Sequence, residues 1–297
     1  GNQFRKETTS SPLLSVPWRN SDPIDSEHLT KLKTRVECYS PPPRVVARRA
    51  KILMLGPFGA GKSSFVNTIN SILQERITQK AIAGTYSKSL TKKYREYPLR
   101  SKNAESEMKF RLCDTCGIAA DEPPDLADLT FLLQGNVPDG YEFKKQPIDN
   151  TTIGFIRNPE LQDQVHCVAY VFAASSIETI QDCIWVKLNE LQNRLNSKDI
   201  PRIILLTKID NLSEVLEKDM SKVFVCDEVK TAVNYVSEKL HVPPGDVMPI
   251  KNYESEGILD KTISYLALQA LDRMLGYADD YLENQYDLMQ RTQNNTA

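Results

Sequence analysis

Short apolar runs alternate with longer segments in which apolar positions recur every three or four residues. The short runs predict buried strands, and the longer segments predict amphipathic helices. The predicted strands are 51–55, 94–100, 109–113, 165–173, 202–207 and 246–250. The predicted helices are 62–74, about 125–134, 179–195, 227–240 and 257–282. Short strands that alternate with helices indicate an α/β domain whose mostly parallel sheet has helices on both faces.

The N-terminal part of the chain lacks this alternation. Residues 1–25 are polar and rich in Ser, Thr and Pro, with Trp18 as a candidate to dock on the core. A short helix is predicted over 26–38 with Asp25 or Ser26 as its cap, and prolines at 41–43 end it. We therefore expect a flexible segment with a short helix over 1–43 and a single domain over 44–297. That domain has an insertion at about 121–160 and a long C-terminal helix.

Charge and composition narrow the classes of partner. The chain has 37 Lys and Arg against 39 Asp and Glu, so it lacks the basic surface of a nucleic-acid-binding protein. No apolar run reaches the roughly 20 residues that a transmembrane helix needs, and no secretory leader is visible. The six cysteines are scattered; Cys113 and Cys116 form a C-x-x-C string without a second ligand pair, so we interpret both as packing residues. These features give no indication of a membrane-spanning or a secreted, disulfide-stabilised protein.

A phosphate-binding loop is predicted between the strand 51–55 and the helix 62–74. Residues 56–63, Gly-Pro-Phe-Gly-Ala-Gly-Lys-Ser, match G-x-x-x-x-G-K-[ST] at every fixed position. The backbone N–H groups of such a loop, with the positive end of the following helix, bind phosphates. Lys62 would neutralise the outer phosphates, and the Ser63 hydroxyl would bind Mg²⁺. The residues predicted to contact the nucleotide here are Gly56, Phe58, Gly59, Ala60, Gly61, Lys62, Ser63 and Ser64.

Two further strings end predicted strands. Asp114 to Gly117 read Asp-Thr-Cys-Gly, so that Asp114 could hold Mg²⁺ and the Gly117 N–H could approach a γ-phosphate; the alternative is a plain strand-ending turn. Thr207 ends the strand 202–207, and Lys208 and Asp210 follow it. Asp210 could accept two hydrogen bonds from guanine that adenine cannot offer, while the Lys208 stem lies over the base. Many GTPases carry Asn at the position of Thr207.

A softer signal follows the last short strand. Lys251 and Asn252 stand where a loop would contact base and sugar, although a solvated turn is equally compatible. His28, His166 and His241 are isolated, and His166, in an apolar strand, is interpreted as a hydrogen-bonded core residue.

Several strings resemble a known family. They are 53–66 (LMLGPFGAGKSSFV), 89–97 (SLTKKYREY), 114–117 (DTCG), 135–143 (GNVPDGYEF), 206–210 (LTKID) and 249–253 (PIKNY), with 11–19 (SPLLSVPWR) before the domain. Together they resemble the interferon-induced protein 44 family of GTPase-like proteins. The resemblance implies a Ras-like P-loop GTPase domain, induction by interferon, a cytoplasmic location and a part in antiviral or antiproliferative responses. It covers nearly the whole chain after about residue 10.

The switch elements are less defined. A threonine hydroxyl should complete the Mg²⁺ shell, and the string SLTKKY favours Thr91, with Thr85 as second choice and a loop without metal contact as the alternative. The predicted metal ligands are thus Ser63, Thr91 and Asp114. Ile118 stands where Ras-like enzymes often carry a water-orienting Gln, so intrinsic hydrolysis should be slow and no catalytic residue is assigned.

Three functions remain open. The first is a switch that binds GTP or GDP with Mg²⁺, in which GTP orders segments 83–91 and 117–134. The second is a non-hydrolysing adaptor that recruits protein partners through 121–160, with a homodimer also possible for either. The third, a P-loop ATPase or nucleoside kinase, is disfavoured by the string at 207–210.

Overall fold

The computed structural model describes residues 13–81, 93–102, 104–119, 122, 124–144 and 146–296. In this part of the chain, six strands form one sheet in the order β2-β3-β1-β4-β5-β6. The strands are β1 Ala50–Leu55, β2 Arg95–Pro98, β3 Phe110–Asp114, β4 Cys167–Ala173, β5 Arg202–Thr207 and β6 Val247–Pro249. The edge strand β2 runs antiparallel to β3, and the other neighbours pair in parallel.

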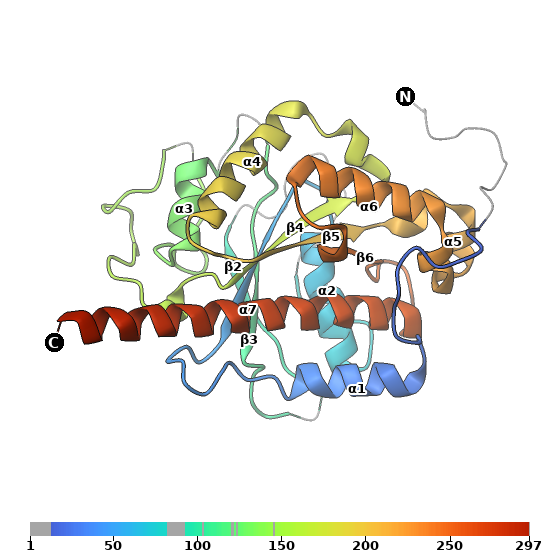
Figure 1. The fold of residues 1–297 in the computed structure, drawn as a ribbon, viewed down its shortest axis with the longest axis horizontal. Helices are drawn as coiled ribbons and strands as arrows, with labels where there is room; N and C mark the ends of the chain where they lie inside the picture. Colours follow the sequence, from blue (N-terminus) through green and yellow to red (C-terminus); the bar gives the residue numbers. More distant parts are fainter. Residues whose placement is uncertain are drawn as a thin grey trace.

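Helices cover both faces of this sheet. The α-helices are α1 Ser26–Glu37, α2 Lys62–Gln74, α3 Leu126–Leu133, α4 Asp182–Asn196, α5 Glu214–Lys218, α6 Asp227–Leu240 and α7 Lys261–Thr296. Short 3₁₀ turns span Leu161–Asp163, Ala174–Thr179, Ile209–Leu212, Met220–Val225 and Pro244–Asp246. Helices α2 and α7 lie on one face, with α1 outside α7, and α3, α4 and α6 lie on the other (Figure 1). The predicted α/β class is confirmed.

Most predicted elements agree with the structure, and α7 differs most. Its hydrophobic pattern predicted 257–282, but the helix begins at Lys261 and continues to Thr296. The start is later because the Asp260 carboxylate accepts the Ile263 N–H at 2.9 Å and so caps the first turn. The end is later because residues 283–296 are mostly polar, so the hydrophobic pattern fades there although the helix continues. Figure 1 shows this end extending beyond the sheet.

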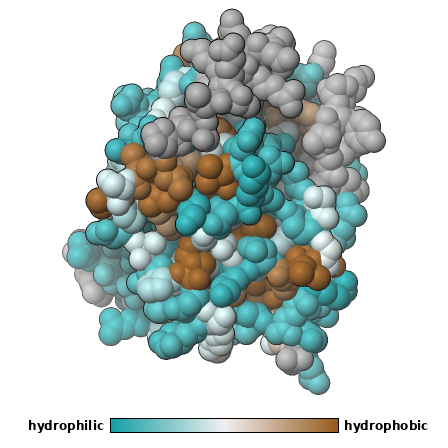
Figure 2. All heavy atoms as spheres, turned by 90° about the vertical axis from the view of Figure 1, so that its right-hand side faces the viewer, coloured by the Kyte–Doolittle hydropathy of each residue, from teal (hydrophilic) through white to brown (hydrophobic). Residues whose placement is uncertain are grey.

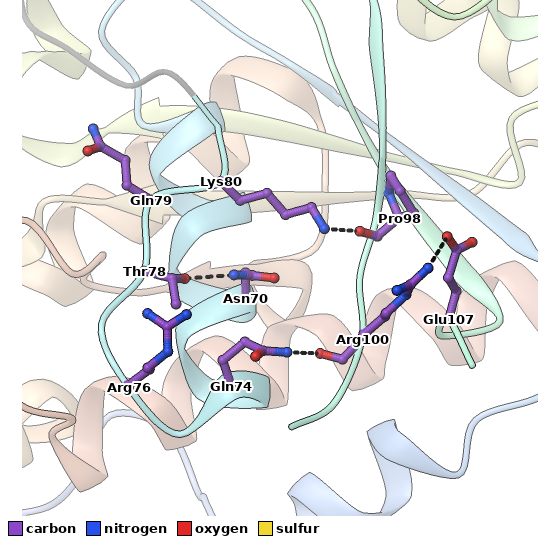
Figure 3. Close-up of a pocket in the computed structure, with 9 residues that line it drawn as sticks. All are labelled: Asn70, Gln74, Arg76, Thr78, Gln79, Lys80, Pro98, Arg100 and Glu107. Carbon is purple, nitrogen blue, oxygen red and sulfur yellow. Dashed lines mark hydrogen bonds and ion pairs between the residues drawn. The ribbon is translucent and has the colours of Figure 1, made fainter. Parts of the chain in front are cut away.

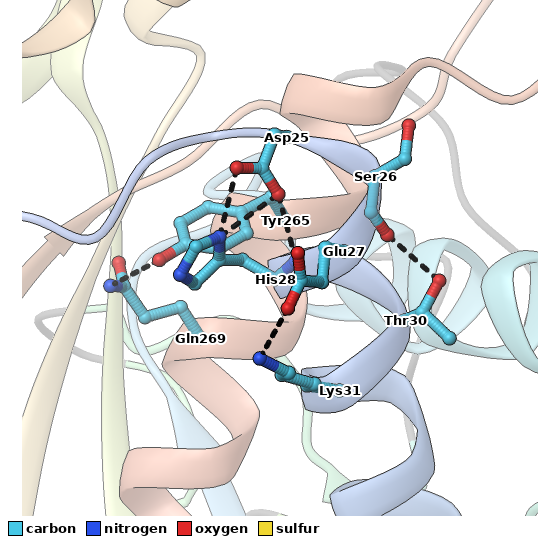
Figure 4. Close-up of polar contacts among 8 residues, drawn as sticks. All are labelled: Asp25, Ser26, Glu27, His28, Thr30, Lys31, Tyr265 and Gln269. Atoms are coloured by element: carbon cyan, nitrogen blue, oxygen red, sulfur yellow. Dashed lines mark hydrogen bonds and ion pairs between the residues drawn. The ribbon is translucent and has the colours of Figure 1, made fainter.

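The N-terminal helix α1 is attached to the domain by its packing. Asp25 is the predicted cap, and its carboxylate accepts the His28 N–H at 2.8 Å (Figure 4). Leu32 and Val36 are buried, and α1 packs against α7. The expectation that Trp18 docks on the core is confirmed, because its indole Nε1–H donates to the Val223 carbonyl at 3.0 Å. The division near residue 43 stays a prediction, and residues 1–12 lie outside the described part.

His166 sits in the core between β1 and the turn before β4. Its Nδ1 accepts the Lys51 N–H at 2.9 Å, and its Nε2 lies 2.8 Å from the Leu161 carbonyl, to which it donates as the neutral ring. Both ring nitrogens are therefore used, which confirms the interpretation as a satisfied core residue. Burial lowers the pKa of His166 to about 4.

This depressed pKa predicts a loss of stability in mild acid. The unfolded chain takes up the proton near pH 6.5 and the folded chain only near pH 4. The neutral ring therefore contributes fully above pH 6.5, and its contribution is lost as the pH falls toward 4. Urea unfolding at pH 7 and pH 4.5 should show the wild type losing about 2 kcal/mol more than His166→Gln, which keeps a donor and an acceptor. Equal losses in the two proteins would contradict this account, and other titrating groups cancel in the comparison.

The hydropathy of the helices, the surface and the cysteines each bear on the expectations from sequence. Within the described ranges, no helix is both long and apolar enough to cross a membrane. One face of the molecule shows hydrophobic side chains in separate patches among hydrophilic ones (Figure 2). The six cysteines, which all lie in the part of the chain that the structure describes, form no disulfide with one another, and Cys113 and Cys116 are buried as the packing interpretation expects.

Candidate functional site

Three of the predicted strings converge at one edge of the sheet. The loop 56–61 follows β1, the turn 115–118 follows β3, and the segment 208–210 follows β5. The residues after β6 lie at the same edge. These strands are parallel neighbours or one strand apart, so their carboxyl ends open in one direction. This edge is where open α/β sheets bind ligands.

The phosphate loop has the tight geometry that its glycines allow. Gly61 has φ +97°, and a Cβ there would lie 2.9 Å from Asn252 Nδ2, so a side chain would be both strained and crowded. A Cβ on Gly56 would lie 2.0 Å from the Val171 carbonyl of β4. Gly59 is also left-handed, and Ser64 lies in the first turn of α2, so the loop and the helix N-terminus follow one another without a break.

Lys62 is the buried cation of this loop. Its side chain is 6% exposed, and its Nζ donates to the carbonyls of Gly56 and Pro57 at 2.9 and 3.1 Å. Burial lowers the pKa of Lys62, while the charge of Asp114 opposes that shift. An ammonium group thus lies within the loop, where its present partners are neutral backbone oxygens.

Asp114 and Ser63, two of the three predicted metal ligands, are in contact. The Ser63 hydroxyl donates to Asp114 Oδ2 at 2.5 Å. Asp114 is fully buried, and its Oδ1 has no hydrogen-bond partner within the described residues. Burial raises the pKa of Asp114, and Lys62 and the Ser63 hydroxyl oppose the rise. An unpartnered carboxylate oxygen beside a hydroxyl fits the oxygen ligands that Mg²⁺ prefers.

The remaining predicted ligand cannot be placed. Thr91 and its alternative Thr85 lie outside the described residues. In the part of the chain that is described, no three His, Cys, Asp or Glu side chains cluster as metal ligands. Because Thr91 lies outside the described residues and Asp114 is the one carboxylate among the predicted ligands, the magnesium site stays a prediction.

The Asp-Thr-Cys-Gly turn lies directly on the phosphate loop. The Ile118 N–H donates to the Gly56 carbonyl at 3.0 Å. Gly117 faces Phe58 so closely that a Cβ would lie 2.7 Å from the Phe58 Cα. The Ile118 side chain is 2% exposed, whereas the Phe58 side chain is 40% exposed. The turn therefore presents its backbone to the loop and no polar side chain from position 118.

Thr207 and Asn252 donate hydrogen bonds to backbone carbonyls at the end of the phosphate loop. Thr207 is buried, and its hydroxyl donates to the Ala60 carbonyl at 2.6 Å. The Asn252 amide donates to the Gly61 carbonyl at 3.1 Å, and its Oδ1 accepts the Thr68 hydroxyl at 3.3 Å. Both predicted base-side residues thus support the loop. Thr68 was not identified from the sequence. The feature that could have suggested it is a polar residue on the buried face of α2.

The predicted base reader Asp210 belongs to a small charged cluster. Lys251 Nζ lies 3.4 Å from Asp210 Oδ2 and 2.9 Å from Glu256 Oε1. All three side chains are about one-fifth exposed, at 19%, 19% and 21%. Lys208, before Asp210, has a left-handed backbone at φ +55°. Glu256 was missed because no motif contains it, and only its spacing from Lys251 could have suggested a pair.

A separate polar hollow lies at the other end of α2. Its volume is about 450 Å³, and it is lined by Asn70, Gln74, Arg76, Thr78, Gln79, Lys80, Pro98, Arg100 and Glu107 (Figure 3). Several of these groups bond to one another, such as Asn70 Nδ2 to Thr78 Oγ1 at 2.7 Å and Arg100 to Glu107 at 3.3 Å. Because the phosphate loop adjoins the first turn of α2, this hollow is not part of the candidate site.

Comparisons with known proteins place the chain among a few relatives. No family model matches it. Interferon-induced protein 44 of Pan troglodytes is 35% identical over 257 residues, which cover 85% of this chain and 57% of that protein. The human interferon-induced protein 44-like is 34% identical over 261 residues, covering 87% and 58%. The chain thus spans little more than half the length of these relatives.

A solved structure was also found. Era of Aquifex aeolicus, in a substituted form bound to GDP·AlF₄⁻, shares 17% identity and a TM-score of 0.35, covering 78% of this chain and 56% of that one. The α/β assignment rests on the sheet order and loop geometry of the chain itself.

Proposed function

The chain belongs to the interferon-induced protein 44 family, and from that premise we propose that it binds guanine nucleotides and hydrolyses GTP slowly, as a switch in an interferon-linked antiviral or immune response. One observation carries the proposal. A complete phosphate loop, the contacting pair Ser63 and Asp114, and the carboxylate of Asp210 open at the same edge of the sheet. A cytoplasmic location and protein partners or a homodimer belong to the same proposal.

The phosphate half of the site would use the loop and α2. The backbone amides of 58–63 and the Lys62 ammonium would bind the outer phosphates. Ser63 and Asp114 would hold Mg²⁺, with Thr91 as the proposed third ligand; the ion would neutralise phosphate charge. The unpartnered Asp114 Oδ1 supports this assignment, because a buried carboxylate oxygen without a partner is costly unless a ligand satisfies it.

The base half of the site would use Asp210. Its carboxylate would accept hydrogen bonds from N1–H and the 2-amino group of guanine, and adenine lacks that pair of donors. The Lys208 stem would lie against the base plane. Thr207 and Asn252 would keep the loop in register with the base, because both bond to its carbonyls.

The buried Ile118 bears on whether a bound nucleotide would be hydrolysed. An aliphatic side chain can neither orient water nor accept its proton, so hydrolysis by the isolated chain should be slow. The second candidate is an adaptor that binds GTP or GDP without hydrolysis and recruits proteins through 121–160. The Ile118 side chain is buried and offers no polar group to a bound nucleotide, which favours that candidate.

Calorimetry with GTP, GDP and ATP, with and without Mg²⁺, tests the proposal. We expect guanine nucleotides to bind at micromolar or lower Kd and ATP about 100-fold more weakly, the loss of two charged hydrogen bonds. Single-turnover hydrolysis should then be far below the roughly 1 s⁻¹ of ordinary enzymes. Failure to bind any guanine nucleotide would sink the proposal, and binding with no turnover at all would select the adaptor.

A further inference from the structure

The ion-pair cluster beside the proposed base site holds a cation in a defined place. Lys251 Nζ bridges Asp210 Oδ2 and Glu256 Oε1 at 3.4 and 2.9 Å. The Glu256 carboxylate is itself fixed, because its other oxygen accepts the N–H groups of Glu254 and Ser255 at 2.8 and 3.2 Å. The Lys251 ammonium and the Glu256 carboxylate are therefore both fixed by neighbouring groups.

This cation keeps its charge and has a donor to spare. Burial lowers the pKa of Lys251, but the hydrogen bond that Lys251 donates to Glu256 and the charge of Asp210 outweigh burial and raise the pKa above its ordinary value. An ammonium group carries three N–H donors, and the two carboxylates engage two of them. The third can meet an acceptor on a ligand bound at Asp210.

The base edge of guanine supplies such an acceptor. Along that edge the 2-amino group and N1–H are donors, and O6 is an acceptor next to N1. The Asp210 carboxylate offers two acceptors, and the Lys251 ammonium, 3.4 Å away, offers a donor beside them. This order, acceptor, acceptor and donor, is complementary to the 2-amino group, N1–H and O6 of guanine. Adenine carries an amino group at position 6, so it would set a donor against the ammonium.

We propose that Lys251 is a second base-reading residue, whose ammonium donates a hydrogen bond to O6 of the guanine held by Asp210. The inference rests on the proposed guanine-nucleotide binding and adds a specificity-determining contact to it. Glu256 is the positioning residue, because it touches Lys251 and holds the ammonium beside Asp210.

A pair of nucleotides and a pair of variants test this contact. 6-Thio-GTP keeps N1–H and the 2-amino group but replaces O6 with sulfur, a weaker acceptor. By calorimetry, the wild type should prefer GTP to 6-thio-GTP by about 10-fold, and Lys251→Met should reduce that preference to about 2-fold while binding GTP about 10- to 100-fold more weakly. Lys230→Met, which removes an exposed lysine of α6, should behave as the wild type.

The outcomes distinguish a failure of the Lys251 contact from a failure of the proposed guanine-nucleotide binding. If Lys251→Met weakens GTP and 6-thio-GTP equally, or weakens neither, Lys251 does not contact O6 and the inference falls while guanine binding stands. If the wild type binds no guanine nucleotide, both fall. Should Lys251→Met lower the melting temperature by leaving two carboxylates unpaired, the double variant Lys251→Met with Glu256→Gln removes that repulsion, and the same loss of nucleotide preference is expected.

Discussion

The variant Lys62→Ala is expected to bind GTP at least about 30-fold more weakly than the wild type. The Lys62 ammonium is buried within the phosphate loop and donates to two backbone carbonyls. Under the proposed function, bound phosphates give this charge a partner of opposite sign. Removing one member of a buried charge pair costs about 2 to 5 kcal/mol, which corresponds to about 30- to 4000-fold in affinity.

The control must separate a lost phosphate contact from a damaged loop. Lys80→Ala is suited to this, because Lys80 also donates to a backbone carbonyl, that of Pro98, but lies in the hollow at the other end of α2. Calorimetry should show Lys80→Ala binding GTP as the wild type does, with thermal melts reporting the fold of both variants. A folded Lys62→Ala protein with undiminished GTP affinity would remove Lys62 from the site.

The features predicted well from sequence are those set by neighbours along the chain. The helix 62–74 and the strand 202–207 were predicted with their observed bounds, because a glycine loop and a buried run delimit them. The contact of Ser63 with Asp114 was foreseeable for a related reason. Two strings that end parallel strands must meet at one edge of the sheet, and β1 and β3 are paired with Met54 opposite Asp114.

The features that were missed depend on contacts between distant loops. Glu256 pairs with Lys251 because the loop after Tyr253 turns back toward Lys251. No residue pattern in the sequence predicts that turn of the loop. Thr207 could be interpreted from sequence as a base contact, yet its hydroxyl bonds to the Ala60 carbonyl, 147 residues away. The polar end of α7 was missed because hydrophobic periodicity reports the face that a helix buries and not where the helix stops.

The variant Asp210→Asn is expected to exchange guanine for xanthine as the preferred base. The variant loses the hydrogen bond from the 2-amino group, and its bond from N1–H no longer goes to an ionised group; together this costs about 2 to 4 kcal/mol, so GTP affinity should fall by about 30- to 1000-fold. An Asn amide still accepts from N1–H, and its NH₂ group donates to the oxygen that xanthine carries at position 2. XTP should therefore bind the variant better than GTP does.

Competition between GTP and XTP, measured by calorimetry on both proteins, decides the role of Asp210. Asp246→Asn is the matched control, because the Asp246 side chain is 16% exposed and pairs with Arg273 at 2.7 Å. Asp246 precedes β6, whereas Lys251 follows that strand, so Asp246 lies at the end of β6 away from the site. That control should keep the guanine preference of the wild type. A guanine preference retained by Asp210→Asn would show that the base is read elsewhere, and the cluster of Asp210, Lys251 and Glu256 would then be a structural ion pair that only braces the loop after β6.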